Sequence, residues 1–424
     1  MTAAVSTPTL DLPARELERL RQRTVWSLVA GVALGSTGHI AAVTVATIVA
    51  QEISGSTTWS GAPGATVVMG AALGAVVLSW VMVRAGRRAG LALGYATGVV
   101  GALIATAGVI AVSLPILLFG TILIGFGNSS NQLSRYVAAD LYPAARRASA
   151  LGTVVWGATI GAVVGPNLAA PASAFAETIG LPPLTGPYLV PVLFVGLATI
   201  LTLVALRPDP YALADHSATP AAGERSTAAS LRDVLRRPNV PVAIVALVTV
   251  QVVMVLIMTM TPLHMTAHHH DLAAVGLVIS GHTFGMFGLS PISGRLSDRF
   301  GSVPVILAGL AVSAFASILA AVSPPDGGVL LFLALFLLGY GWNLGYVAGS
   351  ALLTRDLSLS ERTRLQGLTD GLIWSSAAAA SLGSGVVVAA ASYATLGLLG
   401  AALVIVPALL VIARREAVAR PRTA

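Results

Sequence analysis

The sequence of 424 residues contains no cysteine, no lysine and few charged or aromatic residues. The lack of cysteine excludes a disulfide-stapled secreted scaffold. The lack of lysine excludes the Gly-x-x-x-x-Gly-Lys loop of ATP-driven pumps. Charged residues make up 10% of the chain and hydrophobic residues 56%, with a mean hydropathy of +0.86. A soluble fold cannot bury that much apolar surface, so a soluble enzyme and a disordered chain are excluded as well.

Apolar runs of membrane-spanning length recur along the whole chain. A helix needs about 20 mostly apolar residues to cross a bilayer. Twelve runs meet that length: 24–50, 61–83, 90–112, 115–139, 148–170, 187–206, 239–263, 272–294, 302–323, 328–353, 364–390 and 393–413. The ten-residue alternation of a membrane barrel is missing. The sequence therefore predicts an all-α integral membrane protein with 12 transmembrane helices that lies in the lipid bilayer.

The 24 basic residues, all of them arginine, lie outside the predicted spans or near their ends. They occupy the segments 15–23, 84–88, 135–147, 207–237, 295–299, 355–364 and 414–422. With twelve spans, all of these segments fall on one side of the membrane, and arginine-rich connections face the cytoplasm. We therefore expect both termini to be cytoplasmic. The net charge of +7 is a topology signal on this reading, and we expect no nucleic-acid partner.

A long polar connection divides the predicted helices into two sets of six. The predicted parts are a cytoplasmic N-terminal segment 1–23, a six-helix bundle 24–206, a cytoplasmic linker 207–238, a second six-helix bundle 239–413 and a cytoplasmic tail 414–424. The halves repeat each other weakly, since Arg84 and Gly86 match Arg299 and Gly301 at an offset of 215, and Asp140 matches Asp356 at an offset of 216. The sequence therefore predicts two pseudo-symmetric six-helix bundles that are related by an internal repeat.

The segment Gly294-Arg-Leu-Ser-Asp-Arg-Phe-Gly301 resembles the signature loop of the major facilitator superfamily. The resemblance covers essentially the whole chain and implies the major facilitator fold. It also implies a gating role at the cytoplasmic rim for Asp298 and Arg299, with Arg362 or Arg364 as a partner. The alternative is that these charges only anchor the loop. In the first half Val83 stands where the second half has Asp298.

Methionine and histidine gather in one short stretch. Ten of the fifteen Met and His residues lie between Met254 and Met286. Met254 and Met258 share one face of a predicted helix, and His282 and Met286 share one face of the next. At about 1.5 Å per residue, Met254 and His282 lie at equal depth near the midplane. If these faces meet, the four side chains form a ladder across the membrane.

Thioether and imidazole groups suit Cu(I) best, also tolerate Cu(II), Ni or Co, and are poor ligands for Mg²⁺ or Ca²⁺. The Met-x-x-x-Met and His-x-x-x-Met pairs look like those of the CcoA-type copper importers of bacterial cytoplasmic membranes. That resemblance implies a metal set of Met254, Met258, His282 and Met286. Position alone adds groups for metal capture or relay: His264, Met265, His268, His269, His270 and His39. The alternative is that the methionines fill the core and the histidines are solvated.

Other polar residues fall within the predicted spans. His39, near the middle of the first span, could be a ligand, a proton carrier or an imidazole bonded to a neighbouring helix. Four amides could line a cavity or hold helices together: Asn128, Asn131, Gln132 and Asn343. Buried polar groups of this kind mark substrate pathways in membrane proteins.

The sequence favours a secondary transporter that imports copper by alternating access through the bacterial cytoplasmic membrane. We expect a monomer with no tightly bound cofactor, and no enzymatic activity because no nucleophile–base motif occurs. One alternative is the same fold with an organic cargo, as in a riboflavin-like importer or a drug exporter. That alternative assigns the cargo contacts to Trp156, Trp342, Trp374 and Asn131. The other alternative is a membrane metal sensor that transports nothing.

Overall fold

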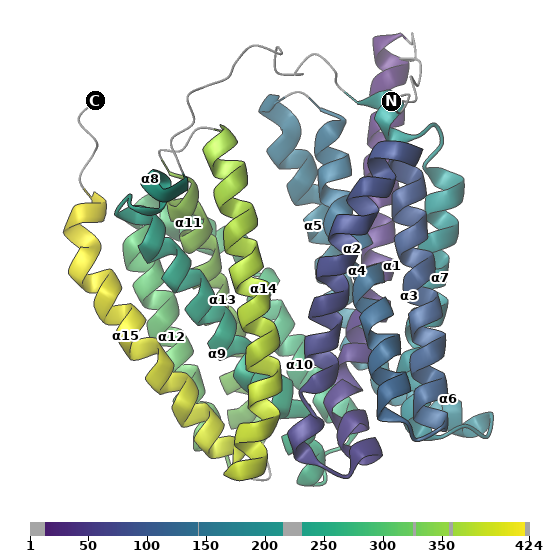
Figure 1. Cartoon of the computed structure of the whole chain (residues 1–424), viewed down its shortest axis with the longest axis vertical. Helices are drawn as coiled ribbons and strands as arrows, with labels where there is room; N and C mark the ends of the chain where they lie inside the picture. Colours follow the sequence, from purple (N-terminus) through teal and green to yellow (C-terminus); the bar gives the residue numbers. More distant parts are fainter. Residues whose placement is uncertain (1–12, 143, 215–230, 325–327, 356–358, 420–424) are drawn as a thin grey trace. The chain divides into compact units, whose positions relative to one another are not determined.

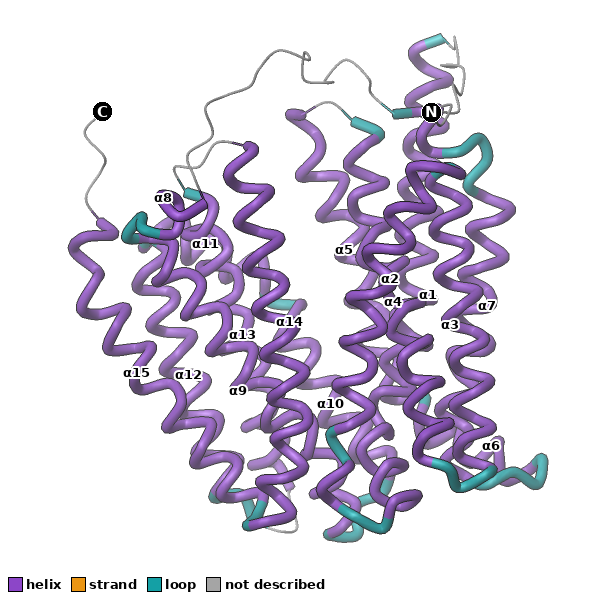
Figure 2. The backbone as a smooth tube through the Cα atoms, viewed as in Figure 1, coloured by secondary structure: helices purple, strands orange, loops and turns teal. Residues whose placement is uncertain are grey.

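The computed structural model describes residues 13–142, 144–214, 231–324, 328–355 and 359–419. These residues form helices joined by short loops, and they contain no strand (Figure 2). Eleven helices are long and apolar enough to cross a membrane. The number rises to twelve when α5 and α6, which bend by 50° at their junction, count as one span. The prediction of an all-α integral membrane protein is confirmed.

The chain divides into two compact units. Unit 1 consists of Met1–Gly55 and Ala62–Ala221, and unit 2 consists of Ser56–Gly61 and Ala222–Ala424. The division after residue 221 falls inside the predicted linker 207–238. The short segment Ser56–Gly61, which joins the first two helices, groups with the second unit rather than with the first.

Unit 1 contains seven α-helices in its described part (Figure 1). They are α1 (Ala14–Ser54), α2 (Ala62–Ala85), α3 (Arg87–Ile110), α4 (Leu114–Asp140), α5 (Ala144–Asn167), α6 (Ala169–Thr178) and α7 (Gly186–Ala205). Two 3₁₀ turns, η2 (Pro183–Thr185) and η3 (Pro210–Leu213), flank α7. Pro115 and Pro187 occupy the first turns of α4 and α7, where a missing N–H costs nothing.

The helices of unit 1 pack around α4 and α1. α4 lies against α2 and α3, and α1 lies against α5 and α7. Gly98 of α3 faces Gly127 of α4, so a Cβ atom on Gly127 would lie 2.6 Å from the Cα of Gly98. The two backbones can approach this closely because neither residue has a side chain. The approach of α3 to α4 positions the polar groups of the pocket described below.

Unit 2 contains the 3₁₀ turn η1 (Thr57–Trp59) and eight described α-helices. They are α8 (Leu231–Leu235), α9 (Asn239–Ala267), α10 (Leu272–Phe287), α11 (Ser290–Phe300), α12 (Ser302–Ala321), α13 (Gly328–Thr354), α14 (Leu359–Ala390) and α15 (Tyr393–Ala419). The carboxylate of Asp271 caps α10 by accepting a 2.8 Å hydrogen bond from the N–H of Ala274. α10 and α11 form a single span with a short break.

The helices of unit 2 pack around α13, which contacts α9, α10 and α12. Asn343 of α13 bridges the break between α10 and α11. Its Nδ2 donates to the carbonyl oxygen of Met286 at 2.5 Å and to the hydroxyl of Ser290 at 2.7 Å. Its Oδ1 accepts a hydrogen bond from the hydroxyl of Ser293. The amide therefore replaces backbone bonds that the break leaves unmade.

The predicted internal repeat is visible in the backbone. Gly86 precedes α3 with φ +94° and ψ 163°, and Gly301 precedes α12 with φ +85° and ψ 157°. Non-glycine residues rarely adopt such positive φ values. The same chain reversal therefore occurs at the matched place in both halves. In unit 1 it is fixed further by Asp209, whose carboxylate accepts hydrogen bonds from the N–H groups of Arg87 and Arg88.

Candidate functional site

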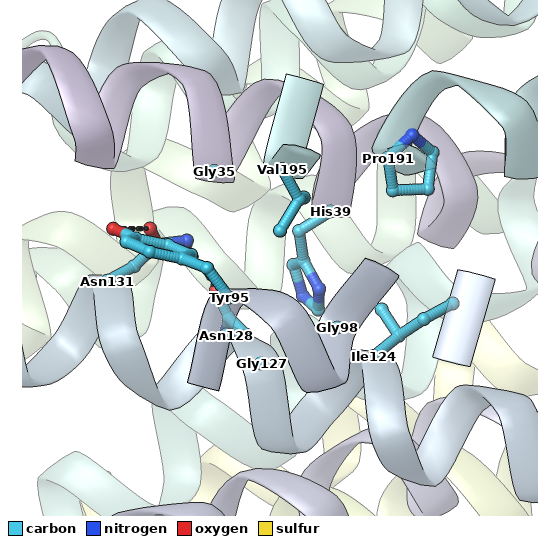
Figure 3. A pocket seen from close by; sticks show the side chains of 10 residues that line it. All are labelled: Gly35, His39, Tyr95, Gly98, Ile124, Gly127, Asn128, Asn131, Pro191 and Val195. Atoms are coloured by element: carbon cyan, nitrogen blue, oxygen red, sulfur yellow. Dashed lines mark hydrogen bonds between the residues drawn. The ribbon is translucent and has the colours of Figure 1, made fainter. Parts of the chain in front are cut away.

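A pocket lies inside unit 1 among α1, α3, α4 and α7 (Figure 3). The spaces between its lining atoms total about 240 Å³ with open solvent included, but only about 10 Å³ can hold the centre of a water-sized sphere, so the pocket has room for about one water molecule in this conformation. Its lining residues are Gly35, His39, Tyr95, Gly98, Ile124, Gly127, Asn128, Asn131, Pro191 and Val195. The glycines bring the helices close together, and the polar side chains project into the space that remains. A mostly apolar cleft with a few polar groups is the usual form of a small-molecule site.

A chain of hydrogen bonds orients the polar wall of this pocket. The phenol O–H of Tyr95 donates to Oδ1 of Asn131 at 3.0 Å. Nδ2 of Asn131 donates to Oδ1 of Asn128 at 2.9 Å. Figure 3 shows the Tyr95 ring beside Asn131, with the bond between them drawn as a dashed line. Because each bond fixes the direction of the next amide, the wall presents donors and acceptors in set positions.

His39 brings an imidazole into the same pocket from α1 (Figure 3). Its Nδ1 is buried and has no hydrogen-bond partner among the described residues. A buried polar atom without a partner is costly, and in native proteins it calls for an explanation. A transient partner such as a cargo or a proton supplies one. No Asp, Glu, Arg or Lys lines this pocket.

The four predicted amides fall into different surroundings. Asn128 and Asn131 line the pocket, whereas Gln132 is not among its lining residues. Asn343 lies in unit 2 and uses its amide to hold α13 against α10 and α11. Of the two roles expected for these amides, Asn343 therefore has the second, which is to hold helices together.

The predicted metal ligands lie in unit 2. Met254, Met286 and the fully buried His282 are part of its interior, and Met258 is half-buried. Nδ1–H of His282 donates to the carbonyl oxygen of Leu335 in α13 at 2.7 Å. Its Nε2, which keeps the lone pair in the neutral ring, is buried and unpartnered among the described residues.

The ladder of facing Met and His side chains depends on contact between α9 and α10. α10 packs along α13 and meets α9 at only a few residues. The two predicted pairs therefore lie on helices that do not pack along their lengths. In the part of the chain that the structure describes, no three His, Cys, Asp or Glu side chains are grouped as metal ligands.

The predicted capture residues cluster at the end of α9. The rings of His264 and His268 lie 4.5 Å apart, and His264 stacks on Tyr393 at 4.1 Å. Met265 is buried, and His269 is exposed with a positive φ of 65°. Nε2 of His270 is buried without a hydrogen-bond partner among the described residues. The imidazoles of His264 and His268 are thus close together, but that of His264 is stacked on the ring of Tyr393.

The defining sequence pattern of the Major Facilitator Superfamily matches residues 25–274 and again residues 242–424. The chain belongs to this superfamily. Among its relatives is an uncharacterised MFS-type transporter of Bacillus subtilis, YdeG, which is 35% identical over 91% of this chain and 90% of the relative. The riboflavin transporter RfnT of Brucella anthropi is 30% identical over 92% of this chain and 96% of the relative.

Solved structures show the same fold. A POT family peptide transporter superposes with a TM-score of 0.71 and 13% identity, covering 95% of this chain and 98% of the other. This major facilitator protein is thus a multi-pass membrane transporter by family and by fold. None of these three similar proteins is described as a copper importer, so the resemblance to that group rests on the Met and His residues alone.

The predicted gating residues of the facilitator chain lie at the end of α11. Asp298 and Arg299 are exposed, and the guanidinium carbon of Arg299 lies 5.2 Å from the centre of the Phe300 ring. The side chain of Arg362 lies outside the described residues. Gating by these groups stays a prediction. In unit 1 Asp140, which the sequence offset pairs with Asp356, forms an ion pair of 3.0 Å with Arg87.

Two residues of the transporter were not selected by the sequence reasoning. Tyr95 contributes the hydroxyl that begins the hydrogen-bond chain of the pocket. In the sequence it is a single tyrosine within a run of small residues, which by itself indicates no site. Arg135 lies inside the predicted span 115–139 but was grouped with the arginines that follow it, and α4 continues through it to Asp140. Its spacing from Asn128 and Asn131 places it on the same helix face, which was the available signal.

Proposed function

We propose that this facilitator protein carries a flat, uncharged organic solute across the cytoplasmic membrane of a bacterium, and that riboflavin is the cargo to test first. The pocket of unit 1 carries the proposal. Its polar wall of Tyr95, Asn128 and Asn131 offers neutral donors and acceptors in fixed positions. Beside them His39 leaves a nitrogen unpaired. The likeness to a riboflavin transporter along nearly the whole chain supports the choice of probe.

The chemistry of riboflavin suits such a wall. Its ring system is flat and uncharged, and one edge alternates carbonyl oxygens with an N–H group. Amide side chains both donate and accept, so they can match such an edge. A neutral set of groups also avoids the large cost of stripping water from a charged pair during transport. Import would follow from alternating access of a site near the bilayer midplane.

Uptake of labelled riboflavin tests this function. The chain is produced in bacteria that lack riboflavin import of their own, and the amount in the membrane is measured for every variant. Asn128→Leu removes one amide from the pocket at nearly constant volume. Because the cargo would lose one or two hydrogen bonds, the KM for riboflavin should rise roughly threefold to tenfold or more. Asn167→Leu, which changes an exposed amide of α5, is the matched control. Absence of riboflavin uptake by the unaltered chain would refute this cargo.

Copper import is the second candidate, favoured by His282. Its Nδ1–H is fixed by the carbonyl of Leu335, which leaves the buried Nε2 as a free ligand atom among the described residues. Metal-binding imidazoles commonly use such a backbone bond to fix the ring. The thioethers of Met254 and Met286 lie in the same unit. Under this candidate the copper ion is the transported substrate.

Accumulation of labelled copper separates the two candidates. Met254→Leu keeps the side-chain volume and removes the sulfur, so the protein should still fold. If copper is carried through this set, Met254→Leu abolishes copper accumulation and Met260→Leu, a buried change on the same helix, leaves it intact. Equal copper uptake by both variants, or none above background in the unaltered chain, excludes this candidate.

A further inference from the structure

Arg135 lies on the face of α4 that lines the pocket. At about 100° per residue, the lining residues Ile124, Gly127, Asn128 and Asn131 occupy a sector of roughly 100° on the helix. Arg135 falls inside that sector, about 20° from Asn128 in projection. Along the axis it lies four residues beyond Asn131, which is about 6 Å. Arg135 is not among the residues that line the pocket, and its guanidinium carbon lies 4.9 Å from the centre of the Tyr136 ring. The polar face of α4 therefore continues past the pocket to an arginine.

The guanidinium of Arg135 has donors to spare. Its Nη2 donates to the hydroxyl of the neighbouring Tyr136 at 3.1 Å. Its Nε is buried and has no hydrogen-bond partner among the described residues. The ion pairs found in the described part of the chain are Arg87–Asp140 and Arg146–Glu18, so Arg135 has no carboxylate partner there. A half-buried guanidinium in that state favours an incoming oxygen acceptor.

We propose that Arg135 binds an oxygen-rich acceptor group of the cargo, while Asn128 and Asn131 bind its ring edge. The proposal rests on the proposed function for the flat ring, and it departs from that function only if the acceptor is an oxyanion, because the cargo would then be charged. The cargo would join a flat hydrogen-bonding ring to a carbonyl or oxyanion group about one helical turn away. The guanidinium presents several N–H donors in a planar fork, which suits carbonyl, carboxylate and phosphate oxygens alike.

The acceptor could be a ring carbonyl or a phosphate, and three probes distinguish the sources. Riboflavin supplies the carbonyls, flavin mononucleotide adds a phosphate, and inorganic phosphate supplies the anion alone. Purified full-length protein is heated with each probe at constant ionic strength, since a ligand that binds the folded state raises the Tm. Riboflavin uptake into proteoliposomes is measured in parallel.

The variants are Arg135→Gln, which removes the charge, and Arg135→Lys, which keeps it. Arg84→Gln is the matched control, because Arg84 also lies beside an aromatic ring near a helix end, 3.9 Å from the ring centre of Trp80, but outside the pocket. Loss of a charged hydrogen bond predicts an affinity lowered on the order of tenfold or more in Arg135→Gln. The affinity of Arg135→Lys should lie between that of Arg135→Gln and that of the unaltered chain. The affinity of Arg84→Gln should equal that of the unaltered chain.

The pattern of loss identifies the acceptor. A carbonyl contact lowers the affinity for riboflavin in Arg135→Gln, whereas a phosphate contact lowers the affinity for flavin mononucleotide or inorganic phosphate. The inference is overturned if no probe distinguishes Arg135→Gln from the unaltered chain. A change only in the amount of protein in the membrane, with affinity per molecule unchanged, would mean that Arg135 is a topology anchor, and would overturn it too. If phosphate stabilises the protein through Arg135 but riboflavin is not carried, the proposed cargo fails and the inference stands.

Discussion

Gly127→Ala should destabilise unit 1 and widen the pocket, because Gly127 lies where α4 touches α3. The added Cβ would lie 2.6 Å from the Cα of Gly98 and 3.0 Å from the carbonyl oxygen of Gly94. Carbon atoms in contact need roughly 3.5–4.0 Å, so the two helices must separate by about 1 Å. Overpacking of this size costs about 1–3 kcal/mol, against a helix-propensity gain of about 0.5–1 kcal/mol for alanine.

Gly152→Ala is the control for the gain in helix propensity that alanine brings. Gly152 lies in α5, is exposed, and has nothing within 4 Å of an added Cβ. The two variants should therefore differ by about 1–3 kcal/mol, or a Tm difference of roughly 2–4 °C per kcal/mol for a unit of this size. Thermal unfolding at one scan rate in one detergent measures the difference. Equal Tm values, or a higher Tm for Gly127→Ala, would refute the close approach of α3 to α4.

Two further changes test the polar contacts that hold the helices. Asp209→Ala removes the acceptor for the N–H groups of Arg87 and Arg88 at the start of α3, so the free energy of unfolding should fall by about 1 kcal/mol. Asp209→Asn should restore most of it, and thermal unfolding of both variants would show this. Asn343→Leu leaves the carbonyl of Met286 and the hydroxyls beside it unpaired, with an expected loss of about 1–3 kcal/mol. A Tm equal to that of the unaltered chain would contradict the bridging role of this amide.

The spans and the repeat could be predicted because their signals are local in the chain. Apolar length alone indicates a membrane helix, and a break in that length indicates its end. Gly86 and Gly301 were paired by sequence offset, and the structure shows nearly the same positive φ at both. Such a backbone angle restricts the residue type strongly, so the sequence keeps a trace of it.

The side-chain groupings could not be predicted to the same degree, because they depend on which helices become neighbours. The rise per residue fixes the depth of Met254 and His282 along their helices but not the direction in which each side chain points. His282 bonds to Leu335 of α13, a helix more than fifty residues away in sequence. The pocket is formed by residues of four helices of unit 1, and nothing in the local sequence around Tyr95 indicates that this tyrosine lines it.

What separates structural from functional polar groups in this chain is whether their hydrogen bonds are complete. Asn343 uses both N–H donors of its amide and accepts a third bond at Oδ1, so it holds a helix break with no donor left for a ligand, whereas Asn131 is bonded at Oδ1 and uses one of its two N–H donors. His39 and Arg135 each keep a buried nitrogen without a partner in the described part of the chain. His39 lines the pocket, and Arg135 lies on the face of α4 that continues past it. A buried polar group without a partner calls for an explanation, such as a ligand, a bound ion or an ordered water molecule. Serine and threonine hydroxyls with the same defect, such as those of Thr47 and Ser173, lie outside any described pocket. At His39 an unpartnered nitrogen and an adjoining pocket occur together, and Arg135 lies about one helical turn beyond that pocket, so these two residues are the better place to look for cargo.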